Sequence, residues 1–161
     1  MAQQLWLLRH GEAEPHDSNT DFDRELTDRG RAQSIAAGRT LAALSIDFQM
    51  VFTSPKVRAR DTARLACAEL GVEALGHEPL ASGFDAREAL ALVAAAGPEQ
   101  RVLVVGHEPD FSAVVGDLTG ARIDMKKGGI AGVRINGAAG ELIVLLRPGE
   151  IVRIAPAPSD D

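Results

Sequence analysis

Two stretches of unbroken apolar residues, 5–8 (LWLL) and 102–105 (VLVV), constrain the fold of this chain more than any other feature. Four consecutive apolar residues without alternation are typical of strands that are buried on both faces, as in the centre of a parallel sheet. The first stretch is followed by Arg9, His10 and Gly11, and the second by Gly106 and His107. In open α/β sheets, ligands bind at the carboxyl ends of the strands. The sequence therefore predicts an α/β fold with a site that contains both histidines.

The composition predicts one domain over residues 1–155, followed by a frayed tail over 156–161, because 161 residues suffice for one hydrophobic core. A formal net charge of −6 argues against nucleic acid as the main partner. Cys67 is the only cysteine, so no intramolecular disulfide can form. No apolar run approaches the roughly 18 residues of a membrane span and no basic leader begins the chain, so we expect a cytoplasmic protein without a membrane partner.

The remaining pattern predicts helices and strands in alternation. Residues 49–53 read as a second buried strand, and Ser54 with Pro55 as the cap and first position of the next helix. Arg58 falls on the first turn of that helix and can reach back over the sheet. Thr27 is predicted to cap an earlier helix, whose core face would contain Ala32, Ile35, Ala36 and Ala43.

Further along the chain, residues 72–79 predict a short edge strand, and Asp85 with Glu88 three positions later predicts a capped helix. Residues 130–135 and 141–146 predict an antiparallel pair at the other edge. The expected architecture is a three-layer α/β sandwich with a mixed, mostly parallel sheet and helices on both faces. His16 and Asp17 could border the site, whereas Lys126 and Lys127 are expected to be solvated.

Two arginines, two histidines and a helix start at one edge of the sheet describe an anion site, since guanidinium groups suit phosphate oxygens. The residues are Arg9, His10, Arg58 and His107. No glycine-rich phosphate loop is present, which argues against a nucleotide kinase or ATPase. The four histidines are too scattered to predict a metal site, and Ser54 lacks the flanking glycines of a serine hydrolase.

Four motifs in order resemble those of the histidine phosphatase superfamily, also called the phosphoglycerate-mutase-like family. They are residues 8–11 (LRHG), 26–30 (LTDRG), 54–59 (SPKVRA) and 106–109 (GHEP). The short length and the RHGEAE opening are most similar to the small phosphohistidine phosphatase subgroup, the SixA-like proteins. Any one of these motifs is weak evidence, but four in the right order are strong evidence.

The resemblance implies that His10 is a nucleophile that carries the phosphoryl group as a covalent phosphohistidine. It implies that Arg9, Arg58 and His107 hold the phosphoryl oxygens, with Gly11 and Ser54 beside them, and that neither metal nor organic cofactor is needed. Larger members of the family carry an inserted cap and a glutamate acid. This sequence has no cap-sized insertion, and its acid candidates are Glu78 and Asp85, the latter more simply explained as a helix cap.

A missing acid favours a substrate with a good leaving group. Imidazole has a reference pKa of about 6.5, whereas an alkoxide needs protonation, so a P–N bond requires less help than a P–O ester. We therefore expect a phosphohistidine phosphatase that acts on a phosphorylated protein. A phosphatase for a small phosphorylated metabolite and a non-catalytic module that binds phosphate or a phosphoprotein are the alternatives. A mutase is less favoured, because it would want the cap.

Overall fold

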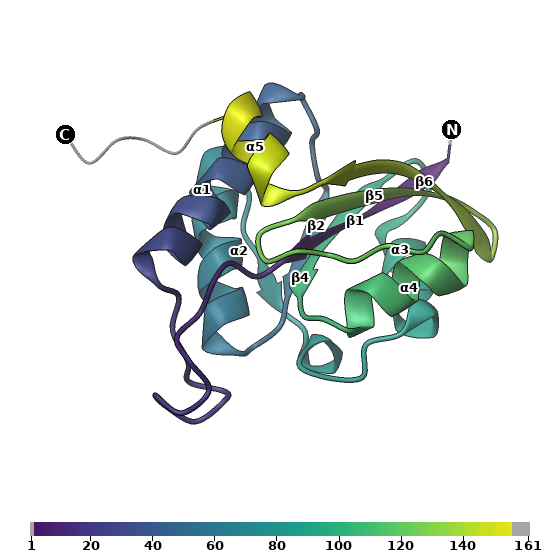
Figure 1. The fold of residues 1–161 in the computed structure, drawn as a ribbon. Helices are drawn as coiled ribbons and strands as arrows, with labels where there is room; N and C mark the ends of the chain where they lie inside the picture. The colour runs from purple at the N-terminus through teal and green to yellow at the C-terminus, as the bar shows by residue number, and fades with distance from the viewer. Residues whose placement is uncertain (1, 156–161) are drawn as a thin grey trace.

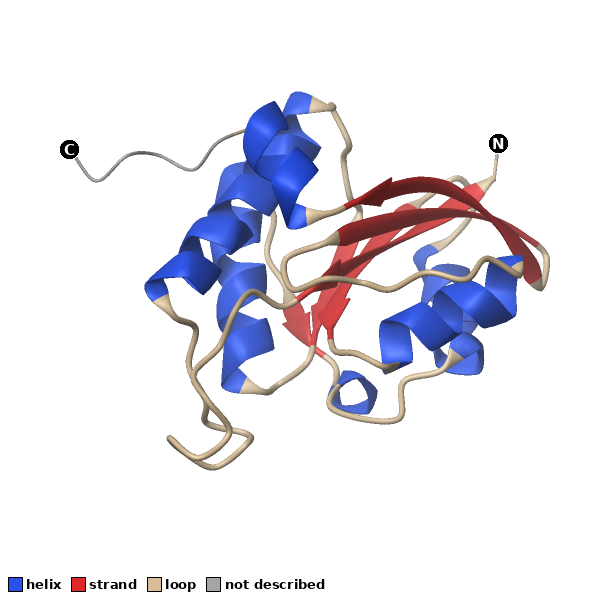
Figure 2. Cartoon of the chain, in the orientation of Figure 1, coloured by secondary structure: helices blue, strands red, loops and turns tan. Residues whose placement is uncertain are grey.

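The computed structural model describes residues 2–155, which form one six-stranded sheet covered by helices (Figures 1 and 2). The elements run in the order β1 (Gln3–Arg9), α1 (Asp28–Ala43), β2 (Met50–Thr53), α2 (Val57–Leu70), β3 (Leu75–Gly76), η1 (Glu78–Leu80), α3 (Ala86–Ala96), β4 (Arg101–Gly106), α4 (Asp110–Thr119), β5 (Ile130–Asn136), β6 (Ala139–Leu146) and α5 (Pro148–Ile154). The predicted tail over 156–161 lies outside the described residues. None of the helices in the described part is long and apolar enough to cross a membrane.

The two unbroken apolar stretches form the centre of the sheet, as predicted. The strand order is β3-β2-β4-β1-β5-β6. The first four strands pair in parallel, and β5 pairs antiparallel with β1 on one side and with β6 on the other. β1 and β4 pair in a register that places Leu8 beside Val105 and Arg9 beside Gly106. His10 and His107, each one residue further on, therefore leave the sheet side by side.

The helices cover both faces of the sheet, which confirms the predicted three-layer sandwich (Figure 1). Side chains alternate between the faces along each strand. Trp6 and Leu8 pack with α1, α2 and α5, whereas Leu5 and Leu7 pack with α3 and α4. Within the described residues, the segments that cross the carboxyl end of the parallel strands are loops and the single turn η1, in agreement with the expected absence of a large cap.

Several helix boundaries follow the predicted local chemistry. The Thr27 hydroxyl accepts a hydrogen bond from the Gly30 N–H, and the Asp85 carboxylate accepts one from the Glu88 N–H, so both residues cap their helices. Gly120 ends α4 with φ of 78°, a conformation that favours glycine. The predicted antiparallel pair is present as β5 and β6, and the predicted edge strand is reduced to β3.

The predicted role of Ser54 as the cap of α2 is wrong. The helix begins at Val57 after an N-cap at Lys56, and no side chain caps it, so Pro55 lies outside the helix. The Ser54 hydroxyl instead accepts a hydrogen bond from the Lys56 N–H at 3.2 Å and lies 2.7 Å from His107 Nε2. Ser54 is fully buried, and its hydroxyl therefore serves the site rather than the helix.

The predicted core face of α1 is also partly wrong. Ala36 is buried, but Ala43 is exposed and Ala32 and Ile35 are only half-buried. The helix is turned so that small residues face α2, because Gly38 lies against the backbone of Ala66 where no Cβ would fit. The sequence reading also missed α5, a short C-terminal helix whose Ile151 is buried beside α1 and α2.

Close packing between the loop after β1 and the start of α1 predicts the effect of a single methyl group. A Cβ on Gly30 would clash with the carbonyl oxygen of Glu12, whereas a Cβ on Gly149 would meet open space. We expect Gly30→Ala to lower the free energy of unfolding by about 1–3 kcal/mol, the usual cost of overpacking. Gly149→Ala should change it by less than about 0.5 kcal/mol. Urea denaturation of both variants tests this, and equal stabilities would contradict it.

Candidate active site

The predicted site residues converge at the carboxyl end of the parallel strands. β1 contributes Arg9 and His10, the turn and helix after β2 contribute Ser54 and Arg58, and His107 follows β4. His10, Arg58 and His107 are 5–6% exposed, and the two histidine rings lie 5.2 Å apart between centroids. A cavity of about 390 Å³ is lined by Arg9, His10, Arg58 and His107 together.

The backbone around His10 fixes its ring in one orientation. The His10 N–H donates to the Gly106 carbonyl at 3.0 Å, and the His10 carbonyl accepts from the Gly128 N–H at 3.0 Å. His10 Nδ1 lies 2.7 Å from the carbonyl oxygen of Gly11. Since a carbonyl can only accept, Nδ1 carries the proton of the neutral ring. The lone pair of the neutral ring is therefore on Nε2.

Gly11 and Thr62 connect the His10 loop to the helix that carries Arg58. The Gly11 N–H donates to Thr62 Oγ1 at 3.1 Å, and the Thr62 hydroxyl donates to the Arg58 carbonyl at 2.7 Å. Gly11 also lies so close to the Gly30 carbonyl that a Cβ would clash there. Gly11 does not line the cavity; it allows the loop to pass between α1 and α2.

Four buried nitrogen atoms of cavity-lining residues lack a hydrogen-bond partner within the described residues: Arg9 Nε, Arg24 Nε, Arg58 Nε and His107 Nδ1. The guanidinium groups are held by other atoms, since Arg9 Nη1 donates to the Met125 carbonyl at 2.8 Å and Arg58 Nη1 to the Asp21 carbonyl at 2.7 Å. A buried donor without a partner costs about 1–3 kcal/mol. These side chains therefore carry donor capacity that no group of the described residues uses.

Burial and positive charge keep the histidines neutral. Burial lowers the pKa of His10 to about 3, although the hydrogen bond that His10 Nδ1 donates to the Gly11 carbonyl acts in the opposite direction, and the charges of Arg58 and Arg9 lower the pKa further. Burial also lowers the pKa of His107 to about 3, with added repulsion from Arg58 and Lys56. The pKa values of Arg9 and Arg58 are lowered by burial as well, but these groups stay charged.

The sequence reading missed a second set of charged residues in the loop after β1. Arg24 is buried and lines the cavity, and Asp21 lines it beside Arg24, Lys56 and Arg58. The Asp21 carboxylate lies 2.9 Å from Lys56 Nζ and 3.0 Å from Arg24 Nη2, which holds the pKa of Asp21 well below its usual range. The loop has no periodic pattern, so only its position directly after Arg9-His10-Gly11 could have indicated these residues.

Other residues near the cavity differ in part from expectation. His16, one of the predicted border residues, lines the cavity, and so does the exposed Lys127 that was expected to be only solvated. Neither Glu78 nor Asp85 lines it: Glu78 is exposed, and Asp85 caps α3. The carboxyl groups that line the cavity besides Asp21 are Glu108 and Asp110.

The carboxylate of Glu108 supports Arg9 through a chain of hydrogen bonds. Glu108 accepts from the Ser112 N–H at 2.7 Å and from the Ser112 hydroxyl at 2.6 Å. Ser112 Oγ accepts from the Met125 N–H at 3.1 Å, and the Met125 carbonyl accepts from Arg9. Among the described residues no group of three or more metal-ligating side chains is arranged to hold a metal ion. Independence of metal stays a prediction.

The parallel strands of this α/β sheet end at a cavity lined by two histidines and several basic side chains, a set of groups that suits an anion, and comparisons with known proteins specify the family. Residues 5–81 match the model of the histidine phosphatase superfamily, branch 1. An uncharacterised protein from a Picosynechococcus species is 36% identical over 148 residues, which is 84% of this chain and 87% of that protein. This chain belongs to the histidine phosphatase superfamily.

Other relatives match over part of their length. A 2,3-bisphosphoglycerate-dependent phosphoglycerate mutase from a Methylobacterium species is 45% identical over 74 residues, which is 44% of this chain but only 36% of the mutase.

Among solved structures, the protein histidine phosphatase SixA complexed with tungstate has a TM-score of 0.84 at 24% identity over 92% of this chain and 99% of that one. A putative phosphohistidine phosphatase SixA from Nakamurella multipartita has 0.80 at 27% identity, with 92% and 97% covered.

The lowered pKa values of the two histidines predict how stability depends on pH. Between about pH 3 and the unfolded value near 6.5, the unfolded state binds more protons than the folded state, so stability is complete above 6.5 and is lost as pH falls. Each histidine contributes a slope of at most about 1.4 kcal/mol per pH unit. We expect His10→Gln to lose less stability than wild type between pH 6.5 and 4.5.

Urea denaturation across this pH range measures the slope. The exposed residue His16 provides the matched control, since His16→Gln removes an imidazole at the rim of the same cavity and should follow the wild-type curve. Identical slopes for His10→Gln and wild type would show that His10 is not held neutral by its surroundings.

Proposed function

We propose that this chain is a phosphatase that removes the phosphoryl group from phosphohistidine on a protein, through a covalent intermediate on His10. The observation that carries the proposal is the state of His10: the ring is buried, neutral, and fixed by the Gly11 carbonyl with its free lone pair on Nε2. A neutral imidazole with a fixed tautomer is ready to attack phosphorus without first losing a proton.

In the first step, His10 Nε2 forms a bond to phosphorus while the bond between phosphorus and the substrate imidazole breaks. The departing imidazole nitrogen takes a proton from solvent. In the second step a water oxygen attacks phosphorus, the bond to Nε2 breaks, inorganic phosphate leaves, and His10 returns to its neutral form. The Gly11 carbonyl supports the positive charge on the ring while the phosphoryl group is attached, because it holds the Nδ1 proton.

The charged neighbours suit the three phosphoryl oxygens. Arg9 and Arg58 bring guanidinium groups, and His107 brings a ring, with nitrogens that have no hydrogen-bond partner in the described part of the chain. The Ser54 hydroxyl, which accepts from Lys56, can donate its own proton to His107 Nε2, leaving Nδ1 as a donor. Donors that are fixed before the reaction stabilise the charge of the in-line transition state without reorganisation.

The carboxyl groups at the cavity favour a P–N over a P–O bond. Asp21 is committed to basic groups, and both carboxyl oxygens of Glu108 accept hydrogen bonds from Ser112, so neither group is positioned to protonate a leaving group. An imidazole leaving group tolerates this, whereas an alkoxide requires an acid. The fold similarity to the two SixA structures supports the same substrate class.

Replacement of the nucleophile tests the proposal directly. We expect the wild-type protein to release phosphate from a phosphohistidine peptide in the presence of a chelator, and His10→Ala to lose at least about a thousandfold in rate. Acid quenching should trap a labelled phosphoprotein with wild type and not with His10→Ala. Turnover by His10→Ala at the wild-type rate would refute the proposal. Binding of the peptide without turnover by wild type would favour a non-catalytic module.

A phosphatase for small phosphate esters is the second candidate, because one carboxyl group in the cavity is less committed than the others. Asp110 is half-buried, lines the cavity, and within residues 2–155 its carboxylate accepts only the Phe84 N–H, at 3.3 Å. If Asp110 protonates an alkoxide, Asp110→Asn should lower ester hydrolysis by about 100-fold or more. Under our proposal we expect Asp110→Asn to leave phosphohistidine hydrolysis within a fewfold of wild type.

The comparison uses phosphohistidine peptide and a panel of phosphate esters side by side. Glu78→Gln is the matched control, since Glu78 is exposed and does not line the cavity. A wild-type preference for one ester, lost in Asp110→Asn and kept in Glu78→Gln, would move the function to metabolite dephosphorylation.

A further inference from the structure

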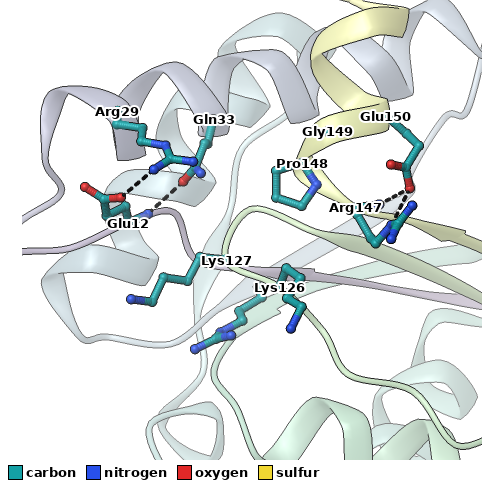
Figure 3. A pocket seen from close by; sticks show the side chains of 10 residues that line it. Glu12, Arg29, Gln33, Lys126, Lys127, Arg147, Pro148, Gly149 and Glu150 are labelled. Carbon is teal, nitrogen blue, oxygen red and sulfur yellow. Dashed lines mark hydrogen bonds and ion pairs between the residues drawn. The ribbon is translucent and has the colours of Figure 1, made fainter.

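A second and larger cavity, of about 660 Å³, adjoins the one that contains His10. Figure 3 shows Arg29 and Gln33 of α1 on one side, Arg147, Pro148 and Gly149 at the start of α5 on another, and Lys126 and Lys127 below them. The two cavities share Arg9 and Lys127 in their linings. A ligand bound at His10 can therefore extend past these two residues into the second cavity.

The second cavity is basic in an acidic protein. Five of the 17 basic residues of the chain line it, but only two of its 23 acidic residues, Glu12 and Glu150. Three of the five basic side chains are paired with a carboxylate: Arg29 with Glu12 at 3.4 Å, Arg147 with Glu150 at 2.8 Å and Lys126 with Asp124 at 2.6 Å. The remaining two, Arg9 and Lys127, form no ion pair within the described residues.

The two basic side chains without an ion pair therefore lie at the junction of the two cavities. Arg9 is directed to the reacting phosphoryl group in the proposed reaction, which leaves Lys127 free for a different anion. Lys127 is exposed and precedes Gly128. The Gly128 N–H donates to the carbonyls of Arg9 and His10, at 3.1 and 3.0 Å. This backbone contact fixes the position of Lys127 relative to the nucleophile, although its side chain remains in solvent.

We propose that the second cavity is a subsite for acidic side chains that flank the phosphohistidine of the substrate protein, with Lys127 as its main contact. The proposal rests on the proposed function and specifies its substrate class. The net charge of −6 would repel an acidic partner elsewhere on the surface, so this cavity is where such a partner can approach. The second cavity has a volume of about 660 Å³, which suits a peptide segment better than a single small anion.

Binding of two matched peptides tests the subsite without depending on catalysis. Both carry a non-hydrolysable phosphonate analogue of phosphohistidine, one with glutamates at the two positions on either side and one with glutamines. The readout is the ratio of their dissociation constants by fluorescence anisotropy. We expect wild type to bind the glutamate peptide about three- to tenfold more tightly, the range of a few exposed charge pairs. The preference should shrink as KCl is raised.

Lys127→Gln should reduce the preference to near one, and Lys127→Arg should retain it, because only the charge is required. Lys126→Gln/Arg147→Gln should leave most of the preference in place, because both side chains are already paired with carboxylates. The control Arg64→Gln/Arg134→Gln removes the same charge from exposed ion pairs with Asp61 and Glu141, outside both cavities, and should leave the ratio unchanged.

Equal affinity of wild type for the two peptides would overturn the subsite, as would a preference that survives in Lys127→Gln. A diphosphorylated metabolite that displaces the glutamate peptide from wild type but not from Lys127→Gln, with no preference between the peptides, would assign the cavity to a small substrate and overturn the proposal. Failure of the phosphatase function shows separately, as an absence of His10-dependent phosphate release, while the binding ratio is still measured.

Discussion

The parallel pairing of β1 with β4 is the constraint on which the site depends. Both strands are buried on both faces, so a shift of one residue would place every side chain on the wrong face. The register that sets Arg9 beside Gly106 brings His10 and His107 out of the sheet at the same level. Their rings then lie 5.2 Å apart, on adjacent strands with no loop of variable length between them. The core thus sets the distance between the two imidazoles.

The same burial that orders the histidines also determines their chemistry. A buried imidazole beside two guanidinium groups is more stable without a proton, and the Gly11 carbonyl decides which nitrogen keeps the remaining one. The nitrogens of Arg9, Arg58 and His107 that have no partner among the described residues are a cost to folding. The same arrangement of nitrogens therefore lowers the stability of the fold and provides donors for a phosphoryl group.

The sequence predicted what depends on local pattern or on buried strands. Continuous apolar stretches identified β1 and β4, and the residues that follow them, Arg9, His10 and His107, are at the cavity because parallel strands end at one edge. Arg24 and Asp21 were missed because they lie in a loop whose path has no periodic signal. The position of Lys127 over the site depends on which strand β5 pairs with, and the sequence does not contain that information locally.

Asp21 stabilises a cluster of positively charged side chains at the site. Three basic groups, Arg24, Lys56 and Arg58, would repel one another in a buried cluster, and the Asp21 carboxylate compensates them from the rim. Asp21 contacts the Nη atoms of Arg58 and leaves its Nε free. The Arg58 guanidinium group is therefore held in one orientation by the carbonyl and the carboxylate of Asp21. The loop after β1 accordingly acts as a support that positions Arg58, which explains why an acidic residue can lie within an anion site.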